Sequence, residues 1–105
     1  MVQQQAAVFA ALGHPTRMRV ITECCRAPRS TSQLQAACAP ITLTGMRKHL
    51  QVLEDAGLVR RRKVGRTVWC SVTPEAIADA SDWLRDLQAF WTTQLDSLAT
   101  ALEQQ

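Results

Sequence analysis

The sequence predicts a single, mainly α-helical domain that carries one small β-hairpin. Its 105 residues fit one domain, since domains typically contain about 100–150 residues. Five stretches space their apolar residues as helices do, and one stretch places strand-forming residues around a glycine turn. The apolar fraction of 47% and the charged fraction of 20% are typical of a folded protein. We find no run near the roughly 18 apolar residues of a membrane span.

Two helices separated by a glycine are predicted at the start of the chain. Residues 3–12 form a short helix that ends at Gly13. Pro15 favours the first position of a second helix, 15–25, because its missing N–H would be unpaired there anyway. The apolar face of this second helix is expected to contain Met18, Ile21 and Cys25.

Two further helices follow, and a side chain can cap each of them. Ser30 or Thr31 caps a short helix at 32–38, and Thr42 caps a longer one at 43–56. Helical spacing buries one stripe of the longer helix, made of Leu43, Met46, Leu50 and Leu53. The opposite side carries polar residues, namely Thr44, Lys48, Gln51 and Asp55, with Arg47 at its edge.

The hairpin is predicted at 58–72. Strands at 58–62 and 67–72 flank the turn 63–66, where a glycine suits a positive φ. Lys63 and Arg66 lie near the tip. The hairpin therefore forms a cationic ribbon.

A long last helix is predicted from Pro74 to residue 102, with Thr73 as its cap. At 1.5 Å per residue it extends about 43 Å, beyond a compact domain whose radius of gyration is about 13 Å. Its distal part therefore needs a partner, and we expect a second copy of the chain; a helix bent back onto the core is the alternative. The apolar seam contains Ile77, Ala80, Leu84, Leu87, Trp91, Leu95, Leu98 and Leu102.

Charge divides the chain into two unlike parts. Residues 1–66 hold 11 of the 12 basic residues and carry a net charge of +8, whereas residues 67–105 carry −5. Seven of the basic residues fall between residues 47 and 66. This polarity is typical of a nucleic-acid binder that has a separate assembly region, although a solvated basic surface would give the same count.

The order of these elements describes a winged helix-turn-helix, with the helix-turn-helix at 31–56 and the wing at 58–72. The helices at 3–12 and 74–102 are expected to dimerise, the second mainly through Leu84, Leu87, Trp91, Leu95 and Leu98. A helix fits the DNA major groove, and wing cations reach the phosphates. The residues expected to enter the major groove are Thr42, Thr44, Arg47, Lys48 and Gln51, while Lys63 and Arg66 hold the flanking backbone.

Three motifs also carry a family resemblance. The segments ALGHPTR (11–17), MRKHLQVLEDAGLV (46–59) and RKVGR (62–66) resemble the ArsR/SmtB family of bacterial repressors. The tail from Trp83 to Leu95 is similar to a branch of that family associated with no metal site. The resemblance implies a dimeric repressor that binds a palindromic operator and often controls its own operon.

The departures from the family pattern concern metal ligands. Metal-sensing members carry a Cys-x-Cys motif at the start of the helix-turn-helix, or Asp, His and Glu ligands on the last helix. Here residues 31–38 keep one cysteine, and the last helix has no histidine. A family-type zinc or nickel site is therefore not expected, and we predict no resident cofactor.

The cysteines and histidines leave alternatives open. Cys24 and Cys25, with Cys38 as a third candidate, could bind a soft ion such as As(III) or report oxidation; as small hydrophobic residues they could also simply fill gaps between helices. Cys-x2-Cys spacing, which would indicate structural zinc, is absent from the sequence. His14 is expected to cap or pack, and His49 to pack or to touch a phosphate.

Other functional classes explain less of the sequence. An enzyme would need a nucleophile paired with a base, or a metal, and the spacing supports neither. A protein-interaction module would use the long helix but leave the cationic hairpin unexplained. The opening residues lack the basic and apolar regions of a secretory signal, so we expect a cytoplasmic protein with reduced thiols and no membrane partner.

Overall fold

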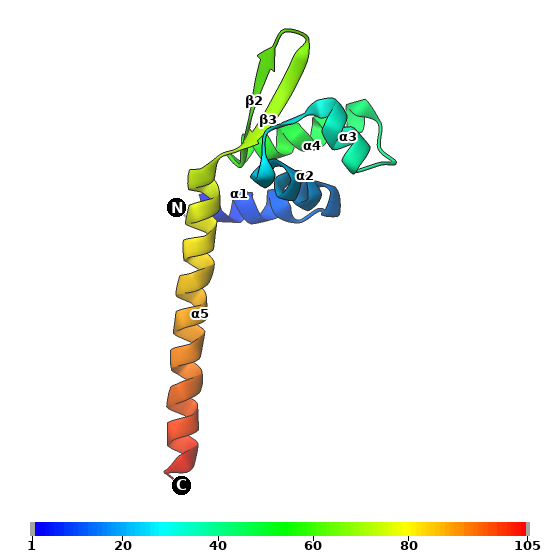
Figure 1. The fold of residues 1–105 in the computed structure, drawn as a ribbon. Helices are drawn as coiled ribbons and strands as arrows, with labels where there is room; N and C mark the ends of the chain where they lie inside the picture. Colours follow the sequence, from blue (N-terminus) through cyan, green and yellow to red (C-terminus); the bar gives the residue numbers. More distant parts are fainter. Residues whose placement is uncertain (1, 105) are drawn as a thin grey trace.

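The computed structural model describes the backbone of residues 2–104 and the side chains of residues 4–104. It confirms a mainly α-helical fold with a β-hairpin (Figure 1). No helix among the described residues has both the length and the apolar character needed to cross a membrane. The elements follow the order α1 (Val2–Leu12), α2 (Pro15–Arg26), β1 (Arg29–Ser30), α3 (Thr31–Ala37), α4 (Leu43–Asp55), β2 (Val59–Val64), β3 (Thr67–Val72) and α5 (Pro74–Glu103).

Side-chain caps explain where three of the helices begin. The His14 side chain accepts a hydrogen bond from the first turn of α2. Ser30 and Gln33 form a capping box at α3, each side chain accepting from the other residue's backbone N–H. At α4 the Thr42 hydroxyl accepts from the Gly45 N–H at 3.0 Å. Each cap satisfies an N–H that the first helical turn leaves free.

The cap predicted at Thr73 is not formed. Thr73 occupies the N-cap position of α5, but its side chain makes no capping hydrogen bond. Pro74 follows at the first helical position and has no N–H to satisfy. The start of α5 therefore relies on the proline rather than on a hydroxyl.

The core lies where α2, α3 and α4 meet the sheet. Residues from all of these elements contribute side chains with almost no exposed surface, among them Val20, Leu34, Met46, Leu50, Leu53, Leu58, Val59 and Cys70. The predicted stripe of α4 is confirmed except at Leu43, which lies at the start of the helix and is 36% exposed. Burial of these aliphatic side chains stabilises each by roughly 1.5–3 kcal/mol relative to full exposure.

The predicted buried face of α2 is confirmed at Ile21 and wrong at Met18 and Cys25. Val20, Ile21 and Cys24 point into the core, whereas Met18 is 57% exposed and Cys25 is exposed too. Both sets have helical spacing, so periodicity alone could not separate them. Contacts with α1, α4 and β3 select the face that is buried.

The sheet contains one more strand than the sequence predicted. The sheet order is β1-β3-β2, with both neighbouring pairs antiparallel. In β1, Arg29 lies opposite Cys70 and Ser30 opposite Trp69. A two-residue strand has no recognisable pattern of its own, because its partner strand alone defines it.

The turn of the hairpin is tighter than predicted. Val64 pairs with Thr67, so both strands continue closer to the tip than expected. Gly65 adopts the positive φ that the sequence predicted, at 62°. Arg66 completes the turn and Lys63 lies within β2, opposite Val68. The wing is therefore a continuous two-stranded ribbon up to its tip.

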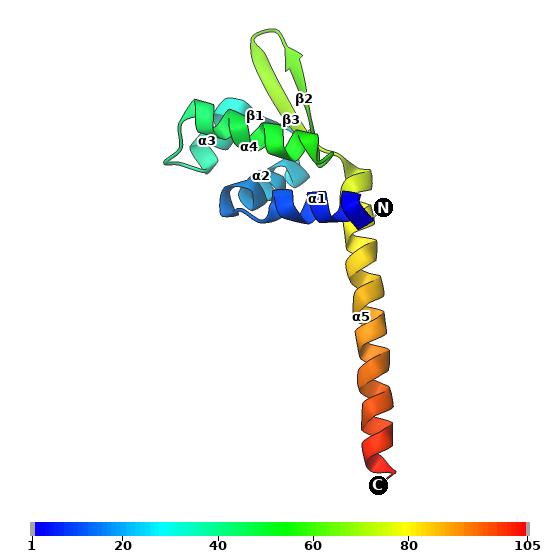
Figure 2. The same cartoon turned by 180° about the vertical axis from the view of Figure 1, so that it is seen from behind.

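Helix α5 leaves the rest of the chain and gives the molecule its shape (Figures 1 and 2). The molecule extends 69 × 27 × 23 Å, and its radius of gyration is 18.4 Å, against about 13 Å for a compact chain of 100 residues. Near its start α5 packs on α1, where the rings of Phe9 and Trp83 lie 5.4 Å apart. Ala80 is the buried residue of α5. The alternative of a last helix bent back onto the core is wrong.

Candidate nucleic-acid interface

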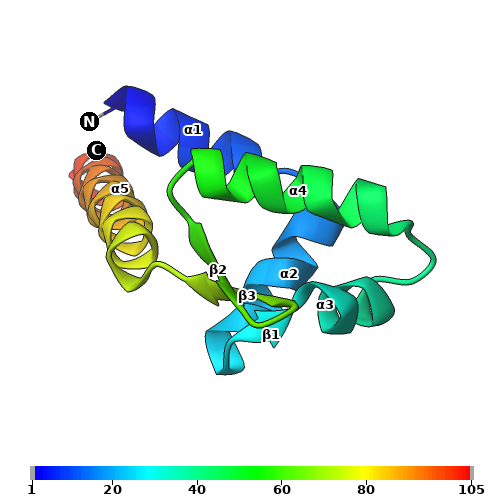
Figure 3. The same ribbon diagram turned by 90° about the horizontal axis from the view of Figure 1, so that it is seen from above.

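The polar side of α4 faces solvent as the sequence predicted. Met46, Leu50 and Leu53 have no exposed surface and fix the rotation of the helix. Figure 3 shows α4 along one side of the body, with α5 and the start of β2 at its C-terminal end. All seven residues predicted to contact DNA are exposed, namely Thr42, Thr44, Arg47, Lys48, Gln51, Lys63 and Arg66.

The four cations among these seven residues have no acidic partner in the described part of the chain. Over residues 4–104, the ion pairs join Arg19 to Glu23, Arg61 to Glu54 and Arg85 to Asp82. None of these pairs includes Arg47, Lys48, Lys63 or Arg66. Unpaired, exposed cations on a helix and on the neighbouring ribbon can bind phosphates without first breaking an ion pair.

Arg61 joins the wing to α4. Its guanidinium donates to Glu54 at 3.0 Å and to the Gln51 side-chain oxygen at 2.6 Å. The Arg61 backbone N–H also donates to Glu54, at 3.1 Å. These hydrogen bonds from Arg61 hold the pKa of the Glu54 carboxyl below its ordinary value. The angle between the helix and the ribbon is therefore set by side chains as well as by the core.

Gln51 is occupied at both ends of its amide. Its nitrogen donates to Asp55 at 2.8 Å, and its oxygen accepts from Arg61. A bidentate contact of Gln51 with adenine would have to break both hydrogen bonds. The structure thus gives Gln51 a role in bracing the wing that the sequence analysis did not anticipate.

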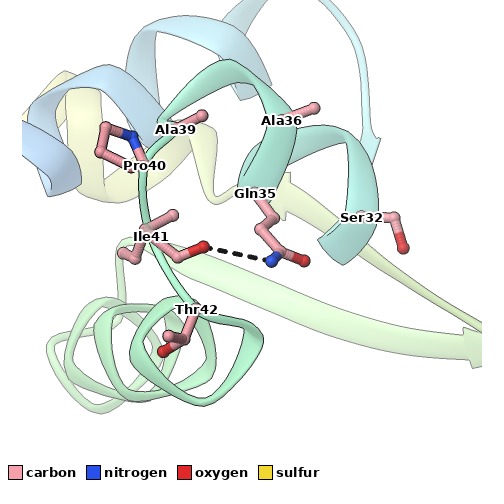
Figure 4. Close-up of a pocket in the computed structure, with 7 residues that line it drawn as sticks. All are labelled: Ser32, Gln35, Ala36, Ala39, Pro40, Ile41 and Thr42. Atoms are coloured by element: carbon pink, nitrogen blue, oxygen red, sulfur yellow. Dashed lines mark hydrogen bonds between the residues drawn. The ribbon is translucent and has the colours of Figure 1, made fainter.

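The turn between α3 and α4 contains a shallow hollow of about 610 Å³. Gln35 crosses it and donates to the backbone oxygen of Ile41 at 3.1 Å, as Figure 4 shows. Ser32 and Thr42 place hydroxyl groups on its two sides. The hydrogen bond from Gln35 ties α3 to the segment that leads into α4 and so fixes the turn.

Comparison with known proteins agrees with this geometry. A helix-turn-helix domain family matches residues 12–62. A solved ArsR family transcriptional regulator is 32% identical, with a TM-score of 0.79 over 88% of this chain and 94% of its own. The chain belongs to the ArsR family of transcriptional regulators. An ArsR-like transcriptional regulator from Rhodococcus sp. RHA1 is also 32% identical, with a TM-score of 0.77 over 92% of this chain and 91% of its own.

One curated relative agrees with this assignment to the ArsR family. The transcriptional repressor SmtB homolog of Synechocystis sp. is 33% identical over 70 residues, which are 67% of this chain and 52% of that protein. This chain thus matches about half the length of the relative. The matched winged helix-turn-helix is the DNA-binding fold of transcriptional regulators.

The cysteines of this ArsR-family chain do not gather into a metal site. Cys24 is buried, Cys25 is exposed and Cys38 is half-buried. Among the described residues, no three His, Cys, Asp or Glu side chains lie where they could hold one metal ion. The soft-ion site predicted from Cys24, Cys25 and Cys38 therefore has no common centre.

The neighbour of Cys24 in this ArsR-family fold is Cys70 from β3. The interaction between the two thiols lowers the pKa of Cys24, and the same interaction together with burial raises the pKa of Cys70. Burial raises the pKa of Cys38. The sequence analysis missed this pair because the two residues are far apart in the chain and only the packing of α2 on β3 joins them.

Apolar side chains are exposed along the distal part of α5 in this ArsR-family protein. The residues predicted to dimerise are all about half exposed or more, with Leu84 at 49%, Leu87 at 50%, Trp91 at 62%, Leu95 at 46% and Leu98 at 57%. Phe90 beside them is 62% exposed. A contiguous apolar surface of this kind marks an interaction site in a folded protein.

Proposed function

We propose that this chain is a homodimeric transcriptional repressor that binds a palindromic operator, including one in the promoter of its own operon. The observation that carries the proposal is an exposed set of unpaired cations on α4 and the wing, beside an uncovered apolar helix. Two copies related by a dyad would present two α4 helices to half-sites about 34 Å apart.

Within this proposal each surface has a separate task. Thr44, Arg47 and Lys48 face the base edges of the major groove, and Thr42 lies at the entry to α4. Lys63 and Arg66 hold the flanking phosphates. Gln51 reaches a base only after releasing Arg61, so its contact couples base reading to the position of the wing.

Selection from a random pool of duplexes of about 30 base pairs tests the proposal, since that length holds two half-sites one helical turn apart. We expect a palindromic duplex to be enriched, and expect it to resemble sequence upstream of the gene. Affinity for that duplex should fall about 10³–10⁵-fold between roughly 50 and 200 mM salt. A salt-independent interaction, or no enrichment, would favour a protein-interaction module instead.

Thiol-dependent release of DNA is a second candidate, favoured by the contact between Cys24 and Cys70. A peroxide would oxidise the two thiols to one disulfide, and the peroxide would be reduced, giving two molecules of water from hydrogen peroxide. Arsenite offers the soft-ion form of the same test. Loss of binding to the selected duplex after either treatment, abolished by Cys24→Ser but not by Cys25→Ser, would support this candidate; unchanged binding would leave the thiols as packing groups.

A further inference from the structure

A polar contact joins three helices behind the DNA-facing side of α4. Arg17, in the first turn of α2, donates through Nε to the backbone oxygen of Ala11 in α1. Its other end, Nη1, lies 3.1 Å from Nδ1 of His49 in the middle of α4. Arg17 and His49 are both half-buried. One guanidinium therefore ties α1 and α2 to the helix proposed to read DNA.

The geometry defines the protonation state of His49. An arginine can only donate, so Nδ1 of His49 must accept and carry no proton. The His49 ring packs against the His14 ring, with centroids 4.5 Å apart. His14 accepts from Thr16 N–H through its own Nδ1. The contact therefore needs His49 to be neutral.

The groups that face His49 all oppose a positive charge on it. They are Arg17 from α2 and His14 from the turn that precedes α2. Burial, His14 and Arg17 together lower the pKa of His49 below its ordinary value. A protonated His49 would lose its hydrogen bond from Arg17 and would be repelled by the guanidinium.

We propose that Arg17 is a positioning residue for DNA binding, which holds α4 in its reading orientation through neutral His49. The proposal rests on the DNA-binding function proposed above. It predicts that acid weakens operator binding, because protonation of His49 releases α4 from Arg17. A histidine that bound a phosphate would do the opposite, since its positive charge would strengthen binding at low pH.

The sign of the pH dependence therefore separates these two roles of His49. Affinity for the selected duplex should be measured between about pH 7.5 and 5.5, where histidine is the side chain that ordinarily titrates. The chain has two histidines, so two substitutions assign the effect. We expect wild-type affinity to fall a few-fold over this range, because a pKa below the ordinary value of about 6.5 protonates His49 only toward its acid end.

Conservative variants test the contact itself. His49→Asn keeps an acceptor near the position of Nδ1 but cannot be protonated, so it should bind within about threefold of wild type at pH 7.5 and lose the pH dependence. His14→Asn keeps a good N-cap and should retain the pH dependence. Arg17→Lys cannot reach both acceptors and should bind about tenfold more weakly at pH 7.5, about the effect of one lost hydrogen bond to a charged group.

The outcomes separate the proposed DNA-binding function from the positioning role of Arg17. No binding of wild type to the selected duplex at any pH would overturn the proposed function. Binding that is independent of pH, that strengthens in acid, or that keeps its pH dependence in His49→Asn would overturn the positioning role alone. Circular dichroism of each variant at both pH values separates a shift of α4 from unfolding. If a variant unfolds, His49→Gln takes its place. The Gln oxygen lies further from the backbone than Nδ1 of His49, so His49→Gln should lose the contact with Arg17 and bind DNA weakly.

Discussion

At the scale of single residues, the cations on the proposed DNA surface differ in their partners. Arg61 is committed to Glu54 and Gln51, whereas Arg66 lies exposed at the wing turn without an ion pair among the described residues. The first cation shapes the surface, and the second is free to bind a phosphate. The sequence alone did not distinguish these tasks, because both side chains belong to the same basic run.

Arg66→Ala tests whether Arg66 contacts a DNA phosphate. We expect the variant to bind all duplexes more weakly and by a similar factor, because a phosphate contact carries no sequence information. The slope of log affinity against log salt concentration should become shallower by about one. Fluorescence anisotropy with the selected duplex and with a scrambled one measures both effects. Arg85→Gln is the control, since Arg85 lies on α5 and pairs with Asp82; unchanged binding by Arg66→Ala would contradict the wing assignment.

Glu54→Gln tests whether Arg61 stabilises the fold through its ion pair with Glu54. Because the pKa of folded Glu54 lies below its ordinary value, its carboxylate stabilises the fold at neutral pH, and this contribution disappears as the pH falls through the folded pKa. A third of the Glu54 side chain is exposed, at 34%, so the effect should be roughly 0.5–1 kcal/mol. Urea unfolding at a fixed protein concentration should show wild type losing more stability than Glu54→Gln between about pH 5 and 3.

The control for this comparison is Glu103→Gln, at the end of α5. It removes an exposed carboxylate that forms no ion pair among the described residues. We expect it to keep the pH dependence of wild type. Equal behaviour of Glu54→Gln and Glu103→Gln would show that Arg61 does not stabilise the fold through Glu54.

At the scale of elements, two threonines occupy the same position at the starts of different helices. Thr42 accepts a hydrogen bond from Gly45 at the start of α4, but Thr73 makes no such bond at the start of α5. Thr42→Ala should therefore lower the free energy of unfolding by about 1 kcal/mol. Thr73→Ala is the matched substitution and should lower it by less. Chemical unfolding of both variants measures the difference, and equal losses would contradict the capping geometry.

Elements with their own local signals could be predicted from the sequence. The helix after Thr42, the capping at Ser30 and the positive φ of Gly65 each depend on residues within a few positions of one another. Strand β1 and the buried face of α2 could not be predicted in this way. Strand β1 is determined by its pairing with β3, and the buried face of α2 by packing against α1, α4 and β3.

The candidate interface shows the same division. The exposed side of α4 follows from the spacing of Met46, Leu50 and Leu53, so its polar residues could be identified from the sequence. The contacts of Arg61 with Gln51 and of Arg17 with His49 join different elements. Sequence offers no signal for such contacts, because any surface arginine could make them.

At the scale of the whole molecule, a single chain leaves the distal apolar residues of α5 without a packing partner among the described side chains. From residue 81 to residue 104 every side chain is exposed. The charges that give residues 67–105 their net −5 all lie on α5. They disfavour contact between α5 and DNA phosphates, while the apolar seam favours a second copy. In the proposed function, this segregation of charge would place assembly and DNA binding at opposite ends of the molecule.

Leu98→Asp tests whether that second copy is present. In a symmetric dimer the substitution occurs twice, and each leucine loses about 1.5–3 kcal/mol of burial. The dimer should therefore dissociate at least about 100-fold more readily, since 1.4 kcal/mol corresponds to a factor of ten. Thr93→Asp adds the same charge on the side of α5 opposite the seam and should leave the dimer intact. Sedimentation of both variants, followed by binding to the selected duplex, should show Leu98→Asp as a monomer that no longer binds; a full Leu98→Asp dimer would mean that α5 does not join the two copies.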